Sequence, residues 1–182
     1  MVKQVQRKKR IENLKKIGWF IIKSNLLAIP LYAIIFLDLS WPPLQEFIAY
    51  VSFVILKGFH FQVAQEGITI FTASLGELNK VDISWDSTGW ESIYTLAALT
   101  LAVSYPLKKK LKFLAFALPS VFLINIVRIV LTIAYSMTFG FKYFDVIHTL
   151  LWREGLILVI LAFWVGWLLK VKYNIRQTHI HI

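Results

Sequence analysis

The stretch FLAFALPSVFLINIVRIVLTIAYSMTF, residues 113–139, contains a single charged residue, Arg128. About 20 apolar helical residues are enough to cross the hydrocarbon core of a membrane, which is about 30 Å thick. Three further apolar runs of comparable length occupy residues 17–37, 89–107 and 148–169. The sequence therefore predicts an all-α integral membrane bundle, a single membrane domain with about four transmembrane helices.

The composition agrees with a membrane location. Of the 182 residues, 58% are hydrophobic and 16% are charged, whereas an average soluble domain has about 25% charged residues. The net charge of +10 lies largely in three clusters, at 3–16, 108–112 and 170–176, and each borders an apolar run. Basic residues in such places set membrane orientation and contact anionic lipid. No nucleic-acid partner is predicted.

The same clusters predict the topology. Four crossings place the basic N-terminal segment 1–16, the loop at 108–112 and the tail 170–182 on one face, which the positive-inside rule assigns to the cytoplasm. The run at 17–37 is too long for the core of a signal peptide, and no small-residue cleavage site follows it. We therefore expect a retained first helix and two cytoplasmic termini.

The segment between the first and second predicted spans is expected on the outer face. An apolar run at 44–58 is too short to cross comfortably, and the charged residues of 59–86 would each cost several kcal/mol in mid-bilayer. We predict an interfacial helix at 44–58. The β-rich runs FHFQV, GITIF and VDISW, with Gly67 and Gly76 at turns, predict a small hairpin or three-stranded flap at 59–86.

Polar residues near the outer ends of the predicted spans are candidates for chemistry. Arg128 and Asn125 lie one turn apart on one helix face, and an arginine at this depth must face the bundle interior, a polar pocket or a partner. Glu91 and Glu154 are candidate partners. A structural ion pair and a functional role for Arg128 are both open.

Ser87 and His148 are predicted at a similar depth, Ser87 before one span and His148 at the start of another. A hydroxyl nucleophile needs a base such as histidine, and an arginine can stabilise the oxyanion formed on a carbonyl. The simpler alternatives are that Ser87-Thr88-Gly89 caps a helix and that His148 is an inert interfacial residue. The chain has no cysteine, which excludes thiolate metal sites, and we predict no metal and no cofactor.

Three ordered motifs resemble the exosortase/archaeosortase family, most closely its archaeosortase branch. They are DISWDSTGWESIYTLAAL (82–99), LINIVRIVL (123–131) and FDVIHTLLW (144–152). The family pattern is Cys-Thr/Ser-Gly, then Asn-x-x-Arg in the next span, then a histidine at the following one. The resemblance covers about residues 58–170.

The resemblance implies an activity and a site. Such proteins are transpeptidase-like membrane proteases, which cleave the C-terminal sorting tails of surface-protein precursors at the extracytoplasmic face. The tail consists of a motif, a transmembrane helix and a basic cluster, and the new C-terminus passes to a membrane lipid. The family's catalytic Cys, Arg and His fall on Ser87, Arg128 and His148, with Asn125, Thr88 and Gly89 in supporting positions.

Ser87 departs from this pattern, because the family has cysteine at its position. A thiol is partly ionised near neutral pH, whereas a serine hydroxyl depends on a nearby base. Three explanations stay open: replacement of a cysteine to give an inactive form, a natural serine enzyme, or a pseudoenzyme that binds tails without cutting them. A non-catalytic membrane scaffold is the alternative from another class. Transport is disfavoured, since no inverted repeat is visible.

Overall fold

The computed structural model describes residues 2–74, 77–150 and 155–178. Its elements follow in chain order: α1 (Val2–Phe36), α2 (Pro42–Gly58), β1 (Val63–Glu66), β2 (Thr69–Ser74), β3 (Glu77–Asp82), the 3₁₀ turn η1 (Asp86–Thr88), α3 (Trp90–Ala102), α4 (Leu107–Phe139), the 3₁₀ turn η2 (Phe141–Tyr143), α5 (Phe144–Thr149) and α6 (Leu156–Thr178). The predicted helical fold with a small β structure is confirmed.

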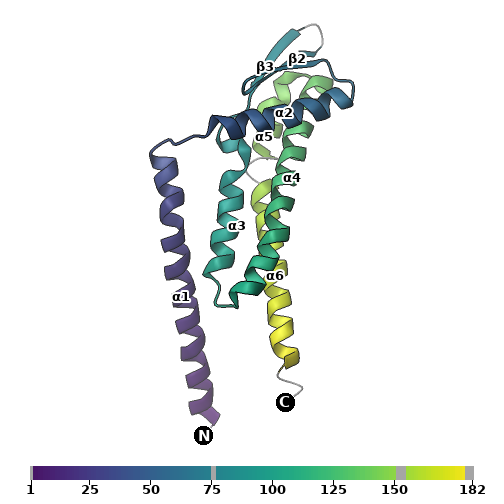
Figure 1. The fold of residues 1–182 in the computed structure, drawn as a ribbon. Coiled ribbons are helices and arrows are strands. Elements are labelled where there is room, and N and C mark those ends of the chain that lie inside the picture. The colour runs from purple at the N-terminus through teal and green to yellow at the C-terminus, as the bar shows by residue number, and fades with distance from the viewer. Residues whose placement is uncertain (1, 75–76, 151–154, 179–182) are drawn as a thin grey trace.

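The long helices run lengthwise, and the remaining elements gather at one end (Figure 1). Helix α3 packs between α1 and α4, and α6 contacts both α3 and α4. Helix α2 lies across the end of the bundle that also carries the sheet and α5, whereas the α3–α4 connection and both termini lie toward the opposite end (Figure 1). We call these the sheet end and the termini end.

Two helical segments within the described residues are long and apolar enough to cross a membrane, Arg10–Phe36 and Leu107–Phe139. The helix expected over 89–107 is shorter than expected: α3 has 13 residues, about 20 Å at 1.5 Å per residue. It ends at Ala102, and Val103 has an extended backbone. Pro106 has no amide hydrogen to donate to the carbonyl of Ala102 and its ring would clash with that carbonyl in a continuous helix. The Lys110 ammonium then donates to the carbonyl of Leu101 at 2.7 Å, which satisfies one of the C-terminal acceptors of α3.

The helix that holds His148 also differs in its bounds. It was expected to begin at that residue and to continue to 169, but α5 begins at Phe144 and has His148 in its last turn. Gly140, with a φ of 101°, ends α4 and allows the turn η2 to follow it directly. The next described helix, α6, begins at Leu156.

The β structure is an antiparallel sheet of three strands in the order β1-β2-β3. Gly67 forms the predicted turn between β1 and β2, with a φ of 55° that glycine adopts without strain. Gly76, the second predicted turn residue, lies outside the described residues. The third strand was expected to reach Trp85, but β3 ends at Asp82. The amide of Ile83 makes one more bond, to the carbonyl of Ile68, before the chain turns into η1 at Asp86.

One apolar core joins α2, the sheet and α4. Its buried members include Ile48, Leu56, Ile70, Val81, Ile83 and Ile133. A second cluster, made of Leu96, Ala117, Val121 and Ile160, joins α3, α4 and α6 below it. Because the first core holds the sheet against α4, it fixes the position of the segment that follows β3.

Truncation of the first core should lower stability. Leu56 is 0% exposed, and Leu56→Ala removes core contacts that typically contribute about 2–5 kcal/mol. Val54, on the same helix, is 47% exposed, so Val54→Ala is the control. We expect a clearly lower thermal unfolding midpoint in detergent for Leu56→Ala alone. Equal midpoints for the two variants would contradict the packing of α2 on this core.

Candidate active site

The segment from Ser84 to Gly89 forms a tight turn between β3 and α3. The amide of Ser87 donates to the carbonyl of Ser84 at 3.1 Å, and the hydroxyl of Thr88 donates to the carbonyl of Trp85 at 2.7 Å. Gly89, with a φ of 77°, then reverses the chain so that α3 begins at Trp90. Ser87 therefore lies in a hydrogen-bonded 3₁₀ turn.

Gly89 also lies directly against Asn125 of α4. A Cβ atom built on Gly89 would be 2.7 Å from the Cγ of Asn125, closer than two carbon atoms can approach. Only glycine satisfies both the left-handed backbone and this contact. The supporting position predicted for Gly89 thus has a packing reason in the structure.

The carbonyl oxygen of Ser87 accepts two hydrogen bonds from α4. Asn125 Nδ2 donates at 3.1 Å and Arg128 Nη2 donates at 3.0 Å. The two donors are three residues apart and so share one helix face. Asn125 is 0% exposed and Arg128 is 6% exposed. We call this arrangement the carbonyl clamp.

The carbonyl clamp leaves further donors and acceptors unused. Arg128 Nε, Arg128 Nη1 and Asn125 Oδ1 are buried and have no hydrogen-bond partner among the described residues. Unpaired buried polar groups are destabilising, and more so when charged. A water molecule or a polar ligand in this place would pair them.

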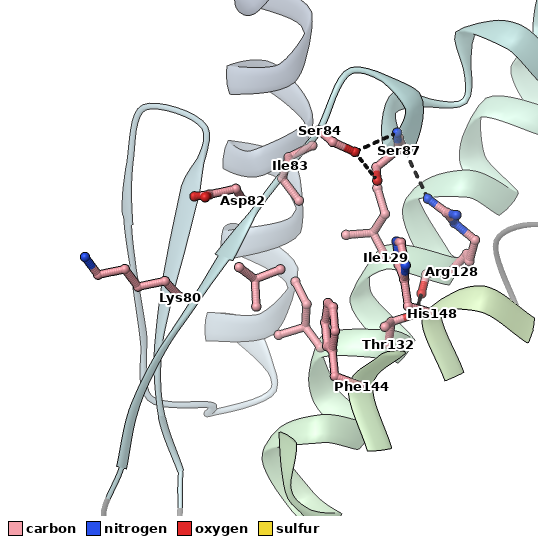
Figure 2. Close-up of a pocket in the computed structure, with 12 residues that line it drawn as sticks. Lys80, Asp82, Ile83, Ser84, Ser87, Arg128, Ile129, Thr132, Phe144 and His148 are labelled. Atoms are coloured by element: carbon pink, nitrogen blue, oxygen red, sulfur yellow. Dashed lines mark hydrogen bonds between the residues drawn. The ribbon is translucent and has the colours of Figure 1, made fainter. Parts of the chain in front are cut away.

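His148 reaches the same site from α5. Its ring stacks on Phe144, with ring centroids 5.5 Å apart and planes 8° from parallel. Phe144 stacks in turn on Phe141. This aromatic support limits the orientations of the imidazole, which points from α5 toward the side of the site where Ser87 and Arg128 lie (Figure 2).

A cavity of about 160 Å³ lies between these groups (Figure 2). It is lined by β3 and the following turn, by α4 and by α5; the lining residues are Lys80, Val81, Asp82, Ile83, Ser84, Ser87, Arg128, Ile129, Thr132, Ile133, Phe144 and His148. An engineered cavity of about 150 Å³ holds a benzene molecule. The three predicted catalytic residues thus share one cavity, with Asn125, Thr88 and Gly89 behind it.

Ser84 was not predicted as a site residue. Its hydroxyl oxygen lies 2.7 Å from that of Ser87, a hydrogen bond in which either can donate. Side chains three residues apart eclipse one another in a 3₁₀ turn, so the Ser84-x-x-Ser87 spacing was the available signal. That signal requires knowledge that the segment is 3₁₀ rather than extended.

Gln45 was also missed. It is a buried member of α2, and its Nε2 donates to the carbonyl of Ile83 at 2.8 Å, just before Ser84. The available signal was the position of Gln45, a polar residue on the buried, mostly apolar face of α2. Its hydrogen-bond partner lies 38 residues away in the sequence, so the sequence does not identify that partner. Gln45 thus ties the turn to α2 as the carbonyl clamp ties it to α4.

Of the two carboxylates predicted as partners of Arg128, the structure describes only Glu91. Glu154 lies outside the described residues. Glu91 lies in the first turn of α3, and the hydrogen bond described for the Arg128 guanidinium goes to the Ser87 carbonyl instead. Within the described parts of the chain, no group of three or more His, Asp or Glu side chains is placed to hold a metal ion.

The fold and cavity define a helical membrane protein with Ser, Arg and His side chains around one site. The sequence model described as "Transmembrane exosortase" matches residues 14–163, most of the chain. The protein therefore belongs to the transmembrane exosortase family, whose members are generally cysteine-protease-like transpeptidases. Comparisons with curated proteins and with solved structures gave no match.

Substitution of Gly89 tests the contact behind the site. Gly89→Ala introduces a left-handed alanine, which costs about 1–2 kcal/mol, and also displaces Asn125. Gly67 has a φ of 55° and nothing within 4 Å of a built Cβ, so Gly67→Ala carries the backbone strain alone. We expect a larger drop in thermal midpoint for Gly89→Ala than for Gly67→Ala. Matching drops would contradict the close approach of Asn125.

Proposed function

We propose that this protein is an archaeosortase-like protease/transpeptidase that cleaves the C-terminal sorting tails of surface-protein precursors and transfers the new C-terminus to a membrane lipid. The observation that carries the proposal is the single cavity shared by Ser87, Arg128 and His148. Family membership supplies the reaction class, and the cavity supplies a nucleophile position, a base and a cationic donor in contact with the same space.

The proposed first step is attack on the scissile carbonyl by the group at position 87. His148 accepts the proton of that group as the new bond to carbon forms. When the C–N bond breaks, His148 returns the proton to the departing amine of the tail. The precursor then remains as an acyl group on residue 87, until the nucleophile of a lipid headgroup displaces it.

Arg128 has two roles in this proposal. Through Nη2 it holds the Ser87 carbonyl and so fixes the turn that carries the nucleophile. Its Nε and Nη1 are the donors left to stabilise the negative oxygen of the tetrahedral intermediate. Such donors act most strongly when they are held in place before the reaction. Arg128 is held in this way, because it is 6% exposed and its Nη2 is bonded to the turn.

The expected activity depends on the presence of a serine rather than a cysteine at position 87. The Ser87 hydroxyl pairs with that of Ser84 at 2.7 Å, a hydrogen bond in which either can donate. When Ser87 donates, it must break this bond before its proton can pass to His148. A cysteine at the same place would ionise far more readily. We therefore propose that the serine form is weakly active or inactive and that position 87 is suited to a thiol.

The proposed topology has four crossings with both termini in the cytoplasm. At the termini end, Lys109, Lys112 and Lys170 line a second cavity together with aromatic residues that include Trp167. Lysines mark the cytoplasmic face and tryptophans the membrane interface. Helix α2 lies across the opposite end of the bundle (Figure 1), which supports an outer interfacial position for it and for the site.

Tail processing tests the mechanism. A precursor with a motif, a transmembrane helix and a basic cluster is co-expressed with each variant, and tail removal is followed by electrophoresis and mass spectrometry. We expect Ser87→Cys to process far more precursor than the Ser87 protein. In the Ser87→Cys background, Arg128→Ala and His148→Ala should each reduce processing by about 10²-fold or more.

Ser120→Ala is the control. Ser120 also lies on α4, but its hydroxyl donates a hydrogen bond to the carbonyl of Phe116 and it does not line the cavity. Full processing by either the Arg128→Ala or the His148→Ala variant would remove the mechanism. A Ser87→Cys protein that binds the precursor yet never cleaves it would favour the alternative, a non-catalytic tail-binding pseudoenzyme.

Single cysteines test the topology in a chain that has none of its own. Leu78, on β3, is 86% exposed, and Lys108, at the start of α4, is also exposed. We expect a membrane-impermeant maleimide to label Leu78→Cys in intact cells and Lys108→Cys only after lysis. The reverse pattern would place the site on the cytoplasmic side and contradict the proposal.

A further inference from the structure

Strand β3 has an open edge beside the cavity. The strand order β1-β2-β3 gives β3 one strand neighbour, β2, within the described part of the sheet. The strand leads through Ile83 and Ser84 directly to Ser87, so its open edge and the candidate nucleophile belong to one continuous stretch of chain. An open edge presents main-chain donors and acceptors that can pair with another extended chain.

The register shows which main-chain groups face that edge. The amide of Ile83 donates to the carbonyl of Ile68 at 3.0 Å, so these two residues form a hydrogen-bonded pair. In an antiparallel ladder such pairs alternate with pairs that direct their main-chain groups outward. Val81 therefore bonds toward β2, whereas the N–H and C=O groups of Lys80 and Asp82 point to the open edge.

The side chains of Lys80 and Asp82 contact β2 rather than the open edge of β3. The Lys80 ammonium lies over the ring of Phe71, 5.7 Å from its centroid, and Asp82 Oδ1 accepts from the Thr69 hydroxyl at 2.6 Å. Both partners are on β2, and Figure 2 shows both side chains directed away from α4. Lys80 and Asp82 nevertheless line the cavity, so their contribution to its wall comes from the main chain.

The spacing of the outward main-chain groups of β3 matches the repeat of an extended polypeptide. The outward groups recur every second residue, about 7 Å apart, which is the repeat of a β-strand. Strand addition of this kind gives affinity through main-chain hydrogen bonds, largely independent of side chains. The cavity of about 160 Å³ is lined on its other side by α4 and α5, so it takes a short part of such a segment.

We propose that the substrate segment next to the scissile bond binds as a fourth strand on the open edge of β3 and is thereby guided to residue 87. This inference rests on the proposed function, since it assumes a polypeptide substrate. The edge recognises the extended shape of the main chain, while Val81 and Ile83, which line the cavity, contact the side chains of the bound segment.

A proline at position 80 tests the proposal. Lys80→Pro removes an amide that points to the open edge and leaves the β2–β3 hydrogen bonds in place, a position where strands tolerate proline. The control is Gln65→Pro on β1. The amide of Ala73 donates to the carbonyl of Gln62, so the amide of Gln65 points outward at the opposite edge of the sheet, away from the cavity.

Binding is measured with the Ser87 protein in detergent and a purified precursor that carries a motif, a transmembrane helix and a basic cluster. We expect Lys80→Pro to weaken binding roughly tenfold or more and Gln65→Pro to leave it within about twofold. Equal binding by Lys80→Pro and the unmodified protein would overturn the edge proposal. Because binding needs no cleavage, this result is independent of whether residue 87 is a working nucleophile.

Hydrogen exchange in the unmodified protein covers the case in which Lys80→Pro does not fold. The amides of Lys80 and Asp82 should exchange more slowly when the precursor is added, whereas that of Gln65 should not change. Unchanged exchange rates at the amides of Lys80 and Asp82 in the presence of bound precursor would overturn the proposal. Protection that depends on protein concentration without precursor would also overturn it, by showing that a second copy occupies the edge.

Discussion

The site is arranged around the carbonyl oxygen of Ser87, which accepts hydrogen bonds from Asn125 and Arg128 of α4. A buried guanidinium is expensive in a membrane protein unless it is bonded, and this carbonyl clamp supplies one such bond. The clamp requires the turn to lie directly on α4, and Gly89 permits that approach. If the clamp were lost, the Ser87 side chain and the remaining Arg128 donors would no longer be fixed relative to one another.

The surrounding bundle has the polarity expected of a membrane protein. On α4, Leu123, Val127 and Leu131 are exposed, with Leu131 at 55%, whereas Asn125 and Arg128 are buried. Exposed apolar residues together with buried polar residues reverse the pattern of a soluble helix, as expected of a helix that crosses a membrane. The same helix is thus long and apolar enough to cross a membrane and also carries Asn125 and Arg128 to the turn that holds Ser87.

Much of this could be predicted from the sequence, because long apolar runs, basic clusters and three ordered motifs are local signals. The helical fold, the small sheet and the family follow from them. The rest depends on tertiary contacts: α3 ends at Ala102 under the influence of Pro106, and His148 lies within α5 rather than at a helix start. Ser84 and Gln45 could not be assigned, since their roles arise from a 3₁₀ turn and from a bond across 38 residues. The number of membrane crossings stays a prediction.

The central claim is that residue 87 carries the acyl group of the substrate. The most direct test is acid quenching of the Ser87→Cys protein during turnover of a tail-bearing precursor, followed by peptide mapping of the covalent adduct. The account predicts a thioester on residue 87 that joins it to the upstream part of the precursor and that is absent from the Ser87→Ala protein. An adduct on Ser84, or efficient processing by the Ser87→Ala protein, would contradict it.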